Sequence, residues 1–141
     1  MKINYNFAET TGTLPLPATF VKALGAKLAE DHPGTGLRLF SRFPFPHAAK
    51  AATYDDFENQ ALDAIQKNPK EPFYRIEPVA GVNSMRYAVA DMMSESCVAC
   101  HNTHPESPKR DWKAGDVRGV LAVTIPLQDV EKQLSASAWT T

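Results

Sequence analysis

Apolar side chains recur at helical spacing in two stretches of the chain, residues 17–31 and 54–67. Pro17 suits the first turn of the first helix, because a missing N–H costs nothing there. Thr53 or Asp55 can cap the second helix. The helical period of the first stretch runs through Phe20, Val21, Leu24 and Leu28. In the second helix we expect a buried stripe of Phe57, Ala61, Leu62 and Ile65.

Four other stretches have the pattern of β-strands. Residues 36–43, 72–80, 84–92 and 117–125 either alternate between apolar and polar positions or are rich in β-branched and aromatic side chains. Residues 81–83 can join the second and third strands as a hairpin, and residues 127–137 form a last helix of modest amphipathicity. This order predicts an α+β fold in which helices flank an antiparallel sheet. We expect an extension over residues 1–13, one domain over 14–127 and a helical connector over 128–141.

Residues 97–101 read Cys-Val-Ala-Cys-His, which is the c-type haem attachment signature. Two thiols at this spacing can add to the two vinyl groups at one edge of a porphyrin. The imidazole of the next residue then lies under the iron, where it can be the proximal ligand. The chain has two cysteines in all, so none is left for a disulfide. We therefore predict one covalent haem c, held by Cys97 and Cys100, with His101 as an iron ligand.

Two other uses of the same thiols stay open. A zinc ion could recruit Cys97, Cys100, His101 and His104, but structural zinc sites usually draw two separated ligand pairs and these four residues fall in one short loop. A thiol redox pair usually starts a helix after a buried strand. The residues before Cys97, numbers 93–96, are too polar for the end of such a strand. Both alternatives therefore rank below haem c.

Composition removes some classes of function. A net charge of −1 argues against nucleic acid as a partner, and no apolar run is long enough to span a bilayer. The first residues also lack the apolar core of an export signal. Haem c is attached outside the cytoplasm, so we expect a periplasmic or other extracytoplasmic location. The missing export signal and the extracytoplasmic location agree if this sequence is a segment of a membrane-anchored protein to which Met1 was added.

Motifs at residues 14–20, 43–46, 86–88, 96–105 and 111–121 occur in an order that resembles the Tll-like family of single-haem c-type sensor domains. The resemblance covers about residues 14–127. It implies a PAS-like fold, one covalent haem c and an extracytoplasmic setting. It also implies a membrane-linked output domain of the kinase or cyclase type as a partner. Cys97, Cys100 and His101 carry over as haem residues, whereas the distal cysteine that some relatives use has no counterpart here.

The other site residues are less constrained. For the sixth iron position the candidates are Met85, Met92, Met93, His32, His47 and His104. Met93 lies four residues before Cys97 and has a thioether suited to haem iron, so we name it as a metal ligand beside His101. Arg86 and Arg118 are the expected partners of the haem propionates, because arginine pairs well with carboxylates. Phe45 and Tyr87 are expected to line the haem pocket.

We expect a signal-input domain rather than an enzyme. A redox change, or a diatomic gas such as NO, CO or O2 at the iron, would alter coordination and shift strand 117–125 and the last helix. The alternative is a small c-type cytochrome acting in electron transfer, although no docking patch of one charge is visible. A haem enzyme would need a distal acid–base pair, and the sequence offers none that we can name. A homodimer through terminal helices is compatible with a PAS-like fold.

Overall fold

The computed structural model describes residues 2–4, 8–50 and 52–138. Residues 1, 5–7 and 139–141, which belong to the predicted extension and connector, lie outside the described residues. Two short strands, β1 (Lys2–Asn4) and β2 (Thr13–Pro15), pair in parallel. The sequence pattern does not predict this pair, because three residues are too few to show an alternation.

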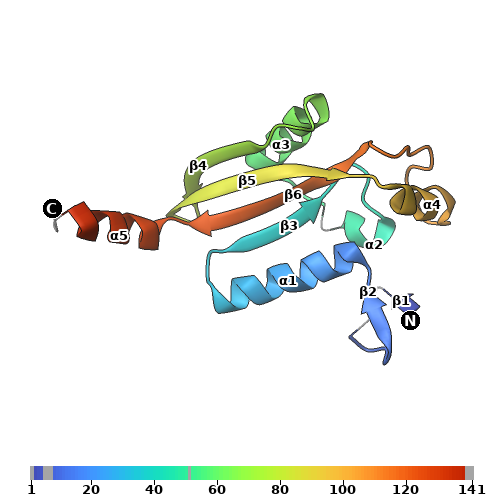
Figure 1. Ribbon diagram of the computed structural model, residues 1–141, viewed down its shortest axis with the longest axis horizontal. Helices are drawn as coiled ribbons and strands as arrows, with labels where there is room; N and C mark the ends of the chain where they lie inside the picture. Colours follow the sequence, from blue (N-terminus) through green and yellow to red (C-terminus); the bar gives the residue numbers. More distant parts are fainter. Residues whose placement is uncertain (1, 5–7, 51, 139–141) are drawn as a thin grey trace. The chain divides into compact units, whose positions relative to one another are not determined.

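Four longer strands form an antiparallel sheet with the order β3-β6-β5-β4. They are β3 (Gly36–Phe40), β4 (Phe73–Val79), β5 (Val82–Met92) and β6 (Val117–Pro126). The helices are α1 (Pro17–Asp31), α2 (Pro46–Ala49), α3 (Asp56–Lys67), α4 (Glu95–Thr103) and α5 (Gln128–Ala138) (Figure 1). The predicted α+β class, with helices flanking an antiparallel sheet, is confirmed.

The chain divides into two compact units. The first unit contains residues 1–39, 76–85 and 123–141, with α1 and α5. The second unit contains residues 40–75 and 86–122, with α2, α3 and α4. The hydrophobic core and the Cys-x-x-Cys-His motif both belong to the second unit.

The core of the second unit lies between α3 and the strands β5 and β6 (Figure 1). The apolar stripe predicted for the helix over 54–67 is buried, as its spacing requires. Along β5, Ala88 is buried against this core, whereas Tyr87 and Val89 on the other face are 39% and 36% exposed. The buried members of the core are Phe40, Phe57, Ala61, Leu62, Ile65, Ala88, Val120 and Ala122.

Helix α3 begins with a capping box. The Glu58 N–H donates to the Asp55 carboxylate (2.9 Å), and the Asp55 N–H donates to the Glu58 carboxylate (3.0 Å). Arg86 of β5 donates to the same Asp55 carboxylate (2.7 Å) and lies 4.3 Å from the centre of the Phe57 ring. Asp55 is therefore the cap, and Arg86 ties β5 to the start of α3.

We expect the Asp55→Ala variant to lose about 1–2 kcal/mol of unfolding free energy, because the helix loses its cap and Arg86 loses an ion-pair partner. Urea denaturation followed by circular dichroism measures this loss. Asp56→Ala is the matched control, since Asp56 is the next residue and is exposed where it pairs with Arg75 (3.1 Å). Its loss should stay below about 1 kcal/mol. Equal losses in the two variants would contradict the capping role.

Two strand boundaries differ from the predictions. Strand β3 ends at Phe40 and not at residue 43, because the Ser41 hydroxyl takes up backbone partners instead. It donates to the Arg118 carbonyl (2.6 Å) and accepts from the Phe43 N–H (3.1 Å). The β4–β5 turn consists of residues 80 and 81, which both have positive φ (50° and 80°), rather than residues 81–83. A two-residue turn of this kind matches the twist of a hairpin.

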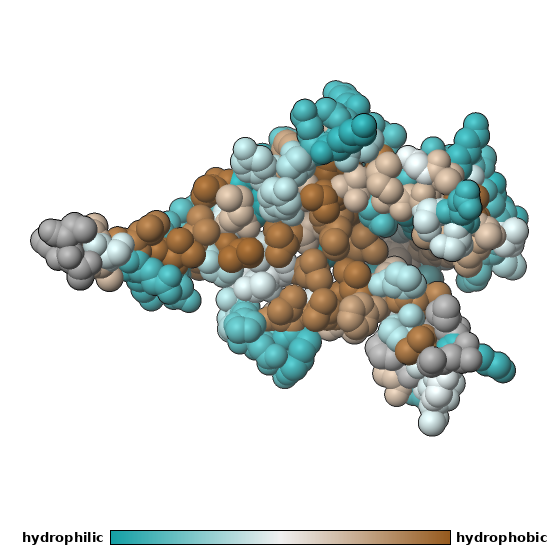
Figure 2. All heavy atoms as spheres, viewed as in Figure 1, coloured by the Kyte–Doolittle hydropathy of each residue, from teal (hydrophilic) through white to brown (hydrophobic). Residues whose placement is uncertain are grey.

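In the first unit, apolar atoms lie on the surface of α1 and α5 (Figure 2). The predicted bounds of α1 are confirmed, and Phe20 and Leu24, which belong to its helical period, are 53% and 41% exposed. Asn83 holds the start of α5: its carbonyl accepts from the Leu127 N–H (2.9 Å) and its amide donates to Glu131 (3.0 Å). Within the described ranges, no helix has the length and apolar character needed to cross a membrane.

Candidate functional site

The Cys-x-x-Cys-His motif lies on helix α4 and not in a loop. Cys97 and Cys100 are separated by three positions, so they lie on one side of the helix. Both are free thiols: Cys97 is half-buried and Cys100 is exposed. His101 follows directly in the same helix and is half-buried. One short helix therefore carries all three groups that the haem signature requires.

Ser94 caps α4 and contacts its first cysteine. The Ser94 Oγ accepts from the Cys97 N–H (3.4 Å) and lies 3.0 Å from the Cys97 Sγ. The helix contains several weak helix formers, which is why its sequence did not indicate a helix. The serine cap supplies the partner that the first turn needs. The loop predicted around Cys97 is therefore wrong.

The imidazole of His101 packs against Phe45. The two ring centres are 5.3 Å apart and the planes meet at 62°. Burial lowers the pKa of His101 below its usual range, and the charges of Arg118 and His104 act in the same direction. The neutral form, which is the form that binds iron, is therefore favoured in the folded chain.

We expect His101 to make the haem-free chain less stable as the pH falls. Because folding favours the neutral ring, the unfolded chain binds more protons near the usual histidine pKa of 6.5. The contribution of His101 is present above that pH and is lost as the pH falls toward the lower folded-state pKa. Urea midpoints above and below this range should fall less in His101→Gln than in the wild type. His32→Gln, at the exposed end of α1, is the control, and an equal fall in all three proteins would contradict this role.

Arg118 of β6 is the cation whose charge reaches the motif. Its Nη1 donates to the Ser41 Oγ (2.5 Å), and its guanidinium lies 5.7 Å from the centre of the Trp112 ring. Its charge acts on His101, and the Cys97 group acts on it in turn. Burial raises the pKa of Asp91, which Arg118 opposes. Arg118 is thus held beside the motif, where a carboxylate could pair with it.

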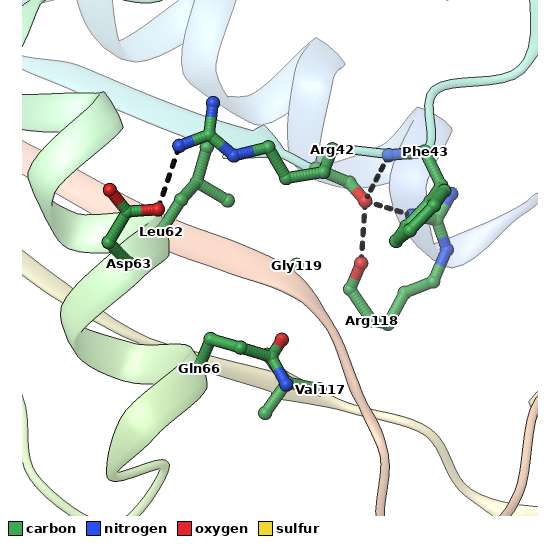
Figure 3. A pocket seen from close by; sticks show the side chains of 9 residues that line it. Arg42, Phe43, Leu62, Asp63, Gln66, Val117, Arg118 and Gly119 are labelled. Carbon is green, nitrogen blue, oxygen red and sulfur yellow. Dashed lines mark hydrogen bonds and ion pairs between the residues drawn. The ribbon is translucent and has the colours of Figure 1, made fainter.

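A small pocket lies next to Arg118 (Figure 3). Arg42 pairs with Asp63 across its rim (3.0 Å), and Phe43 lies beside Arg118. The cavity volume is about 80 Å³, whereas sites for drug-sized ligands occupy ~300–1,000 Å³. A porphyrin attached to α4 would therefore need apolar surface outside this pocket.

The loop after α4 is fixed to the helix and to β5. The Asn102 side chain accepts from the Trp112 N–H (2.9 Å) and donates to the Trp112 carbonyl (2.8 Å). Met93 forms two backbone hydrogen bonds with the far end of the loop, at Gly115 and Asp116 (2.8 Å each). The Met93 side chain is buried, at 3% exposure. We refer to the two contacts, Asn102–Trp112 and Met93–Gly115/Asp116, as the loop clamp.

The structure brings some predicted site residues together and separates others. Phe45 contacts His101, and the charge of Arg118 acts on both His101 and Cys97. The described contacts of Arg86 place it at the start of α3, where it pairs with Asp55. Tyr87 is 39% exposed and stacks on Tyr74, with ring centres 6.1 Å apart. The assignment of Met93 as an iron ligand stays a prediction.

Three residues at the site were missing from the sequence-based assignment. Ser41 orients Arg118, Trp112 packs against both Phe43 and Arg118, and Asn102 anchors the loop. The tryptophan is buried (5%) and lies 4.8 Å from the Lys109 ammonium as well. Asn102 and Trp112 lie within the family-like motifs, and that was the signal that could have identified them.

The structure also bears on the two alternative uses of the thiols. Among the described residues, no three histidine, cysteine, aspartate or glutamate side chains are grouped so that they could hold a metal ion. The zinc alternative is therefore not supported. The motif does start a helix after a strand, as in a thiol redox pair. However, Cys97, the first thiol, is the less exposed of the two.

The donor set on α4 fits covalent haem. It consists of two free thiols at the correct spacing, followed by an imidazole whose neutral form is favoured. Phe45 supplies an aromatic contact for that imidazole, and Arg118 supplies positive charge. These residues lie in an α+β fold in which helices flank a four-stranded antiparallel sheet.

A family model described as Tll0287-like matches residues 2–126. The match covers the second unit and the first unit as far as the end of β6, including α4, and it stops before α5. The chain therefore belongs to the Tll0287-like family. No curated protein and no solved structure matches the chain.

Proposed function

We propose that this chain binds one haem c covalently and acts as the extracytoplasmic input domain of a bacterial signalling protein. Cys97 and Cys100 would each add across a vinyl group, and His101 would be the proximal iron ligand. The observation that carries the proposal is that α4 presents two free thiols and a half-buried imidazole within five residues. Membership of the Tll0287-like family supports it.

The route from the site to an output begins at β6. Arg118, near the start of this strand, contacts Ser41 and acts electrostatically on His101. The strand ends at Pro126, two residues before α5. A change of redox state would alter the charge at the iron, and a diatomic gas would alter its coordination. Either change would act on His101 as the proximal ligand. We propose that β6 carries this change along the chain toward α5 and a membrane-linked output domain.

The first test is the absorption spectrum of the dithionite-reduced, haem-loaded protein before and after addition of NO and CO. A prompt spectral change in both cases supports an open or weakly held sixth position and a gas sensor. A six-coordinate spectrum that neither gas changes supports a redox sensor or an electron carrier instead. If the protein carries no covalent haem after expression with a c-type maturation system, the proposal fails.

The signalling part needs a separate test. Fusion of the domain to a reporter kinase should give an output that differs between the oxidised and reduced states or with and without gas. An output that ignores the haem state would remove the sensor assignment but not the haem site. In that case the electron-transfer alternative can be tested by measuring how fast the protein exchanges electrons with a partner.

A further inference from the structure

Phe45 is held in a rigid segment of the second unit. Pro44 and Pro46 flank it, so the neighbouring φ angles are fixed and Phe45 is confined to extended backbone. Its own angles are φ −62° and ψ 154°. Its carbonyl accepts from the N–H groups of Ala48 and Ala49 (2.8 and 2.9 Å), which forms the first turn of α2. The ring of Phe45 therefore has a fixed origin from which to contact α4.

Three imidazoles surround the Phe45 ring. The His101 and His104 ring centres both lie 5.3 Å from it, with planes at 62° and 85°, and His47 lies at 5.9 Å. These edge-to-face angles are the favourable ones for aromatic pairs. The His104 ring is additionally fixed by the Glu106 N–H, which donates to its Nδ1 (3.2 Å). The His101 ring differs in this respect.

Within the part of the chain that the structure describes, the His101 ring has no hydrogen-bond partner, and Phe45 is the aromatic ring that contacts it. In most metal sites a ligating histidine donates its second ring N–H to a carbonyl or carboxylate, which sets the ring orientation. The protein contact described for the His101 ring is instead the aromatic packing against Phe45. The orientation of the ring then depends on the shape and rigidity of its neighbour.

We propose that Phe45 is the positioning residue for the proximal ligand, because its edge-to-face contact sets the orientation of the His101 ring. This inference rests on the proposed haem c site. Phe45 touches the ligand and has no part in attaching the haem. Without the Phe45 ring, the His101 imidazole would be free to turn about its side-chain bonds.

The test compares Phe45→Leu with Phe43→Leu in the haem-loaded protein. Phe43 lies in the same segment but packs on Trp112, with ring centres 5.6 Å apart, so it is the matched control. We expect Phe45→Leu to change the haem methyl NMR shifts of the oxidised protein, which report the orientation of the His101 ring. Phe43→Leu should retain the wild-type shifts. Phe45→Tyr, which keeps the aromatic edge, should retain them as well.

Wild-type methyl shifts in Phe45→Leu would overturn the proposal, and so would equal changes in Phe43→Leu. A second readout needs no haem. In the haem-free chain, the nuclear Overhauser contacts between the His101 ring protons and the rest of α4 should change in Phe45→Leu and stay in Phe43→Leu, because they report the orientation of the ring itself. If the wild type carries no haem, the proposed function fails, while these contacts still decide whether Phe45 orients the ring. Unchanged contacts in Phe45→Leu would exclude it.

Discussion

The Gly119→Ala variant will lose about 3 kcal/mol of unfolding free energy, a large share of the ~5–15 kcal/mol that stabilises a typical domain. Gly119 is a buried residue of β6, and a Cβ added there would lie 2.3 Å from the Phe40 carbonyl oxygen and 3.1 Å from the Ser41 Cβ. Both obstacles are backbone or short side chain and cannot rotate away. The strands would have to separate, which would also move Ser41 from Arg118. Urea denaturation of the haem-free chain measures the loss.

Gly36→Ala provides the control for this prediction. Gly36 lies at the start of β3, and a Cβ there would meet only the Thr124 Cβ, at an ordinary contact distance of 3.8 Å. Its unfolding free energy should therefore stay within about 0.5 kcal/mol of the wild type. A Gly119→Ala protein as stable as Gly36→Ala would show that the strands tolerate the extra carbon. The close approach of Gly119 to the Phe40 carbonyl would then not limit the stability of the fold.

The second large effect concerns the thiols. Each thioether forms when a thiol S–H adds across a vinyl double bond: the sulfur bonds one carbon, the hydrogen moves to the other, and no oxidant is needed. The Cys97→Ser/Cys100→Ser double variant should therefore lose all covalent haem. Each single variant should keep one thioether and one intact vinyl group, which moves the absorption band of the reduced pyridine complex to longer wavelength.

Haem staining of a denaturing gel after acid–acetone extraction measures the covalent fraction. Ser96→Ala is the control, because Ser96 lies between the Ser94 cap and Cys97 and contributes no thiol. It should carry as much covalent haem as the wild type. Covalent haem in the double variant would mean that attachment uses other residues, and loss of haem in Ser96→Ala would mean that a general disturbance of α4 explains the result.

Much of the fold follows from local sequence. The bounds of α1 depend on Pro17 and the breaker cluster after Asp31, and the buried face of α3 depends on apolar spacing. These are signals that neighbouring residues carry. The strand β6 is rich in β-branched residues, so its start and its approximate end were also predictable.

What the sequence could not supply are contacts between residues that are distant along the chain. Arg86 was assigned to a haem propionate, which stays a prediction, and the sequence did not indicate its ion pair with Asp55 at the cap of α3. Phe20 and Leu24 follow a helical period, but no described element covers them. A period gives the face of a helix and not the identity of its neighbour.

At the site, too, neighbouring residues could be interpreted from the sequence, whereas contacts between distant residues could not. The spacing of Cys97, Cys100 and His101 indicates their chemistry directly, and Phe45 was expected at the site from the density of aromatic residues around it. The helical form of α4 was missed because it depends on the Ser94 side chain rather than on helix propensity. The role of Ser41 was missed because a serine at the end of a strand carries no pattern that distinguishes it from a surface residue.

The loop clamp has a mechanical consequence. Asn102 is the residue directly after His101, and its side-chain amide is hydrogen-bonded to the backbone N–H and carbonyl of Trp112. Met93 is hydrogen-bonded to the end of the same loop, just before β6. A displacement of His101 would therefore also move Trp112, through the side chain of Asn102. Nine residues separate Asn102 from Trp112 along the chain, so the two hydrogen bonds of the Asn102 amide, and not the backbone between them, link the end of α4 to the segment that leads into β6.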